Sequence, residues 1–210
     1  GGEEIMIAVI DYGAGNLKSV KNALDHLGAA NMRASTAKEI LLADAVILPG
    51  VGEFGTAMAE LERRGIKEAV IEAANGGRPL LGICLGMQLL FEAGEESPGA
   101  KGLGILPGRV PRFPAEMGLK IPHMGWNSVM PLKENRLLDG LPKGSYMYFV
   151  HSFYVKAAER ADVSAISEYG LIFDAAVERG NIFGCQFHPE KSGAAGLVIL
   201  KNFIEIAKGE

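Results

Sequence analysis

Short apolar runs alternate with stretches of helical periodicity through the first half of the chain. Each run is continuous and leads toward glycine, which is typical of strands buried on both faces of a parallel sheet: residues 5–10, 45–48 and 79–81. Between the runs, hydrophobic residues recur at the spacing of amphipathic helices: Val20, Ala23, Leu24 and Leu27, then Met58, Leu61 and Ile66, and a further segment over 67–74. Asn16 is a candidate N-cap for the first helix, and Gly28 a candidate stop.

This β-α-β-α order predicts an α/β fold with a doubly wound, mainly parallel sheet flanked by helices. After residue 100, prolines and glycines become frequent and the pattern favours antiparallel or mixed strands added to that sheet: 103–110, 119–130, 145–156, 163–168, 171–178 and 181–188. A last helix is expected over about 193–207. We find no internal repeat and no linker, so residues 1–210 are expected to form a single domain. Residues 1–5 are expected to be a tag remnant or disordered, with Met6 as a candidate native start.

Composition limits the function further. The chain has 210 residues, a net charge of −4 and no basic block, so nucleic acid is not an expected partner. No apolar run has the roughly 18 residues of a membrane span, and no signal peptide is visible. Two cysteines do not form a disulfide framework, and Cys185 lies in an apolar run as a core residue. A reducing, cytoplasmic compartment is expected. No His or Cys pair has metal-ligand spacing, and no cofactor is predicted.

The run Gly82-Ile83-Cys84-Leu85-Gly86 follows an apolar strand and precedes a helix-like segment. A nucleophile between two glycines at such a turn indicates a nucleophile elbow. The turn is tight, so a Cβ two residues to either side of Cys84 would clash, and glycine removes it. The sulfur is then expected to be exposed at the carboxyl end of the sheet, at the start of a helix that favours the thiolate. The alternative is a buried cysteine in a glycine-rich turn.

A second chemical motif, Phe187-His188-Pro189-Glu190, lies near the C-terminus. In an extended chain His188 and Glu190 point the same way, so the carboxylate can orient the imidazole. The imidazole can then take a proton from Cys84 and return it to a leaving amine. We therefore predict a catalytic triad of Cys84, His188 and Glu190. His123 and His151 compete with His188 for this role, because either could lie close to Cys84 in space.

Five segments carry a family resemblance, and they occur in the family's order along nearly the whole chain: residues 11–16, 48–54, 82–92, 122–127 and 187–192. The chain resembles the class I glutamine amidotransferases. The elbow and His-Pro-Glu are shared across that superfamily. The Pro-Gly-Val-Gly and Pro-His-Met-Gly-Trp-Asn runs resemble one branch more closely, the glutaminases that serve histidine biosynthesis.

The resemblance implies further site residues. The oxyanion of the tetrahedral intermediate would be held by the backbone N–H of Leu85 in the elbow and by one from the glycine loop of Gly50, Val51 and Gly52. In the family, a peptide of this glycine loop must reorient to complete the oxyanion hole. The alternative is that residues 49–52 form only a tight turn. Glutamine would be bound by Gln88, one turn beyond Cys84, with Glu96, Ser152 and Phe153. The Gly94 before Glu95-Glu96 departs from the family's usual serine.

The same branch docks on a (β/α)8 barrel cyclase subunit, which the resemblance implies as the partner. Trp126, the only tryptophan, lies in a polar, glycine-rich setting that suits an interface anchor, or else it packs a loop. Other positions match the docking face of the branch: Asn16, Lys18, Tyr148 and Lys191. The asparagine and the lysines could equally be solvated surface residues.

The combined prediction is a Cys-His-Glu glutaminase that passes ammonia to a cyclase subunit making imidazole glycerol phosphate. Such glutaminases are nearly silent until the partner and its nucleotide ligand are present. Three alternatives stay open: a glutaminase subunit of the anthranilate or aminodeoxychorismate type, a stand-alone cysteine hydrolase, and a non-catalytic binder. The identity of the partner would distinguish the first alternative. Turnover without a partner would indicate the stand-alone hydrolase, and the absence of turnover would indicate the binder.

Overall fold

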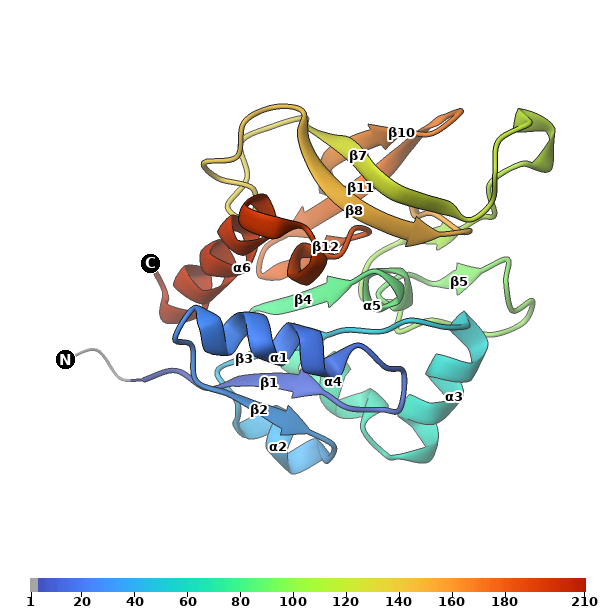
Figure 1. The fold of residues 1–210 in the computed structure, drawn as a ribbon. Coiled ribbons are helices and arrows are strands. Elements are labelled where there is room, and N and C mark those ends of the chain that lie inside the picture. The colour runs from blue at the N-terminus through green and yellow to red at the C-terminus, as the bar shows by residue number, and fades with distance from the viewer. Residues whose placement is uncertain (1–3) are drawn as a thin grey trace.

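A computed structural model describes residues 4–210. Most of the strands form one nine-stranded sheet in the order β2-β1-β3-β4-β12-β11-β10-β7-β8 (Figure 1). Five neighbouring strands pair in parallel: β2 (Asn31–Ala34), β1 (Ile7–Ile10), β3 (Ala45–Leu48), β4 (Leu80–Ile83) and β12 (Ile182–Cys185). The next four are antiparallel: β11 (Ile172–Arg179), β10 (Val163–Glu168), β7 (His123–Pro131) and β8 (Ser145–His151). The predicted parallel sheet with added antiparallel strands is confirmed.

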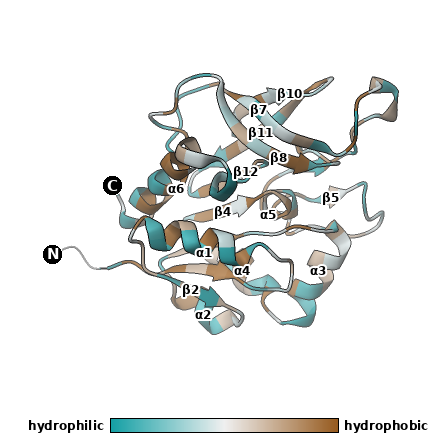
Figure 2. Cartoon of the chain, viewed as in Figure 1, coloured by the Kyte–Doolittle hydropathy of each residue, from teal (hydrophilic) through white to brown (hydrophobic). Residues whose placement is uncertain are grey.

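Helices cover both faces of the sheet. One face is covered by α1 (Leu17–His26) and α6 (Gly193–Lys208), and the other by α2 (Ala37–Leu42), α3 (Phe54–Arg63) and α4 (Lys67–Asn75) (Figure 1). Alternate residues of β1 enter two separate cores, Ala8 on one face and Val9 on the other. A strand buried on both faces must be apolar at every position, which explains the continuous run in the sequence. In Figure 2, α1 shows both hydrophilic and hydrophobic colours, as expected for a helix with one side on the sheet.

Smaller elements complete the chain. The helix after the elbow, α5 (Leu85–Leu89), has five residues. A second sheet has the order β5-β6-β9, from β5 (Ala93–Gly94), β6 (Gly108–Val110) and β9 (Lys156–Ala157). Three 3-10 turns are η1 (Ala115–Met117), η2 (Arg160–Asp162) and η3 (Pro189–Lys191). None of the helices described in residues 4–210 combines the length and apolar character needed to cross a bilayer.

Several sequence expectations were wrong in detail. Asn16 stands at the N-cap position of α1, but it has a left-handed backbone (φ 63°) and its side chain makes no capping bond. The strand expected over 103–110 is confined to Gly108–Val110, because the preceding residues form loop. The elements β2 and α2 were not predicted, although Thr36 and Glu39 form a capping box at the start of α2. The expectation for residues 1–5 falls mainly on 1–3, which lie outside the described residues; Ile5 packs against the core.

Candidate active site

The turn after β4 brings Cys84 to the carboxyl end of the parallel strands. Its backbone adopts φ 55° and ψ −112°, a conformation that a non-glycine residue rarely takes and that marks a strained elbow. A Cβ on Gly86 would overlap the carbonyl of Leu48, and one on Gly82 would lie 2.7 Å from the Gly86 oxygen. The predicted need for glycine on both sides is confirmed. The expected exposure of the sulfur is wrong, because neighbouring loops and β8 leave Cys84 only 5% exposed.

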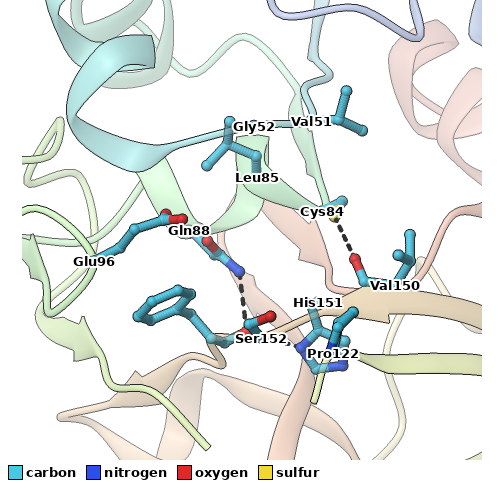
Figure 3. A pocket seen from close by; sticks show the side chains of 11 residues that line it. Val51, Gly52, Cys84, Leu85, Gln88, Glu96, Pro122, Val150, His151 and Ser152 are labelled. Carbon is cyan, nitrogen blue, oxygen red and sulfur yellow. Dashed lines mark hydrogen bonds between the residues drawn. The ribbon is translucent and has the colours of Figure 1, made fainter. Parts of the chain in front are cut away.

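A pocket of about 300 Å³ reaches this buried cysteine (Figure 3). Residues from five separate segments line it: the loop with Val51 and Gly52; the elbow and helix with Cys84, Leu85 and Gln88; Glu96; Pro122; and the run from Val150 to Phe153. Seven of the eight residues predicted for the oxyanion hole and the substrate are therefore together around one cavity. The eighth, Gly50, does not line it; a Cβ at this position would overlap the Tyr12 hydroxyl.

His188 and Glu190 follow β12, the neighbour of β4 in the sheet. Since Ile83 and Cys185 are paired in register, both chains leave the sheet side by side. His188 Nδ1 lies 2.6 Å from Glu190 Oε1, and both side chains are fully buried. Glu190 is in the 3-10 turn η3 and not in an extended chain as assumed, yet the turn still directs its carboxylate to the ring. The backbone N–H of His188 donates to the carbonyl of Tyr148 on β8 at 2.9 Å.

The electrostatics of His188 favour the transfer of a proton from the Cys84 thiol to the imidazole. Burial disfavours the cation, but Cys84 and Glu190 beside the ring outweigh it and raise the pKa of His188 to about 10. Within residues 4–210, Nε2 has no hydrogen-bond partner that meets normal geometry. That buried nitrogen is the atom left to exchange a proton with the thiol or with substrate.

Asn16 lies at this pair and not only at the surface. Its Nδ2 donates to Glu190 Oε1 and stands 3.3 Å from His188 Nδ1. Because Nδ1 must donate to the carboxylate, the amide and the imidazole share one acceptor oxygen. The local sequence carries no signal of this contact, since the partners are separated by more than 170 positions.

The Pro49–Gly52 loop is held in one orientation. The Val51 N–H donates to the carbonyl of Ala14 at 2.9 Å, and the Tyr12 hydroxyl donates to the carbonyl of Pro49 at 2.7 Å. Leu85 is the first residue of α5, so its N–H has no acceptor within the helix. In this conformation Leu85 can offer a donor to an oxyanion, whereas the Val51 N–H is already engaged.

Comparison with known proteins decides the family. The family model described as "Glutamine amidotransferase class-I" matches residues 8–207. This chain belongs to the class I glutamine amidotransferase family. The amidotransferase is 53% identical to the imidazole glycerol phosphate synthase subunit HisH of Desulfitobacterium hafniense (strain DSM 10664 / DCB-2) over 94% of this chain and 93% of that protein. It is 48% identical to the protein of the same name from Methanothermobacter thermautotrophicus, over 97% and 100%.

Solved structures share the fold at lower identity. The PurLQS structure from Thermotoga maritima superposes on the amidotransferase with a TM-score of 0.76 at 19% identity, covering 97% of this chain and 99% of that one. A second crystal structure, titled as a glutamine amidotransferase, gives 0.75 at 22% identity, with 96% and 98% covered. At these identities the likeness supports the fold alone.

Two glutamines of the amidotransferase lie beside Cys84. The Gln88 Nε2 donates one hydrogen to the Phe153 carbonyl at 3.1 Å (Figure 3). It donates the other to Gln186 Oε1, also at 3.1 Å. Its oxygen is thus the atom left to accept a bond, and in this conformation the amide has no hydrogen left to donate to a substrate carboxylate. Gln186 was missed in the sequence; its amide lies 3.7 Å from Cys84 Sγ. Its one signal is a position two residues before His188.

Glu96 reaches the opposite wall of the pocket. Its Oε2 accepts the Phe54 N–H at 3.0 Å, and burial raises the pKa of its carboxyl above the usual value. The rival histidines are engaged elsewhere: His151 lines the pocket, but both of its ring nitrogens are hydrogen-bonded, to His123 and to the Phe153 carbonyl. They are therefore not placed as His188 is. No group of three or more metal-binding side chains occurs between residues 4 and 210.

The residues expected at a docking face lie near the triad. Trp126 on β7 is 56% exposed and meets Tyr148 on β8 edge to face, with ring centres 6.1 Å apart. Lys18 and Lys191 are exposed. The outward residues of these two strands form one apolar surface, which we call the β7–β8 face: Met124, Trp126, Met130 and Tyr146, with Tyr148 half-buried among them.

Proposed function

We propose that this chain hydrolyses glutamine to glutamate and ammonia with Cys84, His188 and Glu190, as the glutaminase subunit of an imidazole glycerol phosphate synthase of histidine biosynthesis. The observation that carries the proposal is the buried His188–Glu190 pair beside an elbow cysteine that opens into a pocket. Curated relatives named HisH, about half identical over nearly the whole chain, support the choice of synthase. The expected compartment is the cytoplasm.

The chemistry begins with the Cys84 thiolate paired to the His188 imidazolium. The sulfur attacks the carboxamide carbon of glutamine, and the carbonyl electron pair moves to oxygen. As the oxyanion collapses, the C–N bond breaks and His188 gives its proton to the departing nitrogen, which leaves as ammonia. A thioester on Cys84 and a neutral imidazole remain. His188 then takes a proton from water, hydroxide adds to the thioester, and glutamate leaves as the thiolate is restored. Glu190 holds the imidazole orientation in both halves.

The far end of the pocket suits the amino-acid part of glutamine. Gln88 Oε1 and the Glu96 carboxylate can accept hydrogen bonds from the α-ammonium, while the backbone of Ser152 and Phe153 faces the α-carboxylate. The oxyanion has one donor ready at Leu85. The second, Val51, must first leave the Ala14 carbonyl. One missing oxyanion donor costs about 10²–10³ in rate, so we expect this loop conformation to keep the activity of the isolated chain low.

We propose the β7–β8 face as the surface that docks the cyclase barrel. Its exposed tryptophan, tyrosine and methionines are the residue types enriched at interface centres. The Tyr148 carbonyl also accepts the backbone N–H of His188, so strand β8 connects the face to the triad. Asn16, Lys18 and Lys191 would lie at the rim. Ammonia would then pass to the cyclase subunit without an added cofactor.

The test is glutamate release by the purified chain, alone and with a cyclase barrel and its nucleotide ligand, with Cys84→Ala as the control. Strong stimulation that disappears in the variant supports the proposal. Folded protein that binds the barrel but releases no glutamate in any mixture refutes the catalytic assignment. Activity that is indifferent to the barrel favours a stand-alone hydrolase, and stimulation only by a chorismate-using subunit favours the anthranilate or aminodeoxychorismate type.

A further inference from the structure

Two buried histidines outside the triad form a continuous hydrogen-bonded chain with the pocket. His123 on β7 and His151 on β8 are direct cross-strand partners. His123 Nδ1 lies 2.9 Å from His151 Nε2, and His151 Nδ1 lies 2.8 Å from the Phe153 carbonyl. At the other end, Asn127 Nδ2 lies 3.2 Å from His123 Nε2. Every ring nitrogen of the pair therefore has a partner.

The partners at the two ends determine where the protons are. A carbonyl can only accept, so His151 Nδ1 donates to Phe153 and its Nε2 must accept in the neutral ring. His123 Nδ1 therefore donates to His151, and its Nε2 accepts from the Asn127 amide. The oxygen and nitrogen of the Asn127 amide cannot exchange places, because Nδ2 also donates to the Glu168 carbonyl at 2.7 Å and Oδ1 accepts the Ser128 N–H at 2.8 Å. Only one arrangement satisfies the chain: both imidazoles neutral, each with its proton on Nδ1.

The surroundings favour the same protonation. Both side chains are buried. His123 stacks on Tyr169 at 4.2 Å and on Phe149 at 5.0 Å between ring centres, and Phe113 and Phe173 meet His151. Burial lowers the pKa of His151 to about 3 and that of His123 to about 4. A cation would have too many donors and no charge partner here.

The chain ends at the segment that lines the pocket opposite Cys84. The Phe153 carbonyl accepts from two sides, His151 Nδ1 and Gln88 Nε2, and both are themselves bonded further. Figure 3 shows His151 and Ser152 side by side below Gln88. Fixing this carbonyl fixes the peptide plane that joins Phe153 to Tyr154. The preceding peptide is held by the Ser152 carbonyl, which accepts the Phe113 N–H at 3.0 Å, so the backbone on both sides of Phe153 is held where it lines the cavity.

We propose that His123 and His151 are positioning residues: a neutral imidazole pair that holds the Ser152–Phe153 backbone in the geometry needed to bind the amino-acid end of the substrate. The inference rests on the proposed glutaminase function. Among the described residues, neither imidazole is hydrogen-bonded to Cys84, His188 or Glu190, so the pair acts on substrate binding through the backbone and not on the bond that reacts.

The first test needs no turnover. In the ¹⁵N-histidine spectrum of the whole chain at pH 7, both rings are expected to show a proton on Nδ1 and a bare Nε2. Substitution His123→Asn assigns one of the two. A cationic ring, or a proton on Nε2 of either histidine, overturns the proposal whether or not the chain hydrolyses glutamine.

The second test is kinetic and uses the complex with the cyclase subunit. His123→Phe keeps the ring stacking but leaves His151 Nε2 without a donor, whereas the amide nitrogen of His123→Asn can replace Nδ1. We expect His123→Phe to raise KM for glutamine about tenfold with kcat changed less than about threefold, and His123→Asn to restore most of KM. Alkylation of Cys84 by iodoacetamide should keep its wild-type rate.

His26→Phe, the same exchange at an exposed position of α1, is the matched control. If His123→Phe lowers kcat and alkylation together while KM stays constant, the pair only supports the core and the proposal is wrong. If the wild-type complex has no glutaminase activity, the proposed function fails, and the spectrum still decides the state of the pair.

Discussion

Replacing Asn16 by alanine should weaken both the fold and the triad. Glu190 is a carboxylate with no exposed side-chain surface, and its Oε1 accepts from His188 Nδ1 and Asn16 Nδ2. Its Oε2 has no partner among residues 4–210. Within residues 4–210, Asn16→Ala removes one of the two hydrogen bonds to this carboxylate, and the side chain has no exposed surface at which water could replace the bond.

The magnitude follows from the type of bond. A hydrogen bond to a charged group contributes about 1.5–3 kcal/mol to stability, and we take about 2 kcal/mol for this one. For a chain of this size, that lowers Tm by about 4–8 °C. Because the carboxylate is also freer to rotate, the imidazole is held less firmly, and we expect kcat to fall by roughly tenfold, which corresponds to about 1.4 kcal/mol.

The assays are thermal unfolding of the isolated chain and glutamate release in the cyclase complex. Asn22→Ala, at an exposed position of α1, is the matched control and should change neither. If Asn16 serves only for docking, as the family resemblance alone implies, Asn16→Ala will weaken binding to the cyclase while Tm of the isolated chain matches the control. That outcome would refute the positioning argument.

Three further predictions concern pH, docking and the elbow. His151 stays neutral in the fold and takes up a proton when unfolded, so its contribution to stability is full above pH 6.5 and should fall by about 2 kcal/mol between pH 7.5 and 5. The raised pKa of His188 has the opposite effect, and its contribution to the stability of the fold is lost as pH rises from 6.5 toward 10. Urea unfolding of the wild type and of His151→Asn at several pH values isolates the effect of His151. Equal pH dependence of the two unfolding free energies would contradict the prediction. Trp126→Glu should weaken cyclase binding at least about 100-fold by calorimetry without lowering Tm of the isolated chain; unchanged affinity would exclude the β7–β8 face. Gly86→Ala should destabilise the fold by more than about 3 kcal/mol, because backbone must move away from Leu48, and a soluble variant with wild-type Tm would show that the elbow is not tightly packed.

Features that depend on neighbouring positions could be predicted from the sequence. The continuous apolar runs at β1, β3 and β4 predicted buried strands, because successive residues of a strand point to opposite faces of the sheet and both faces are covered by a core. The glycines around Cys84 predicted the elbow because the clash they avoid is local. His188 and Glu190 are two residues apart, so their contact survived even though the backbone between them is a 3-10 turn and not a strand.

Features made by contacts between distant segments required the tertiary structure. Only the packing of α1 against η3 brings Asn16 to Glu190, and only the approach of the Ala14 loop engages the Val51 N–H. The pairing register of β7 and β8 sets His123 opposite His151; a shift of one residue would turn one ring outward. The edge strand β2 escaped prediction because it is half-buried and its residues follow no clear period. Local sequence determined which groups can react, and long-range packing decided which of them are free, which are already bonded and how deeply the cysteine is buried.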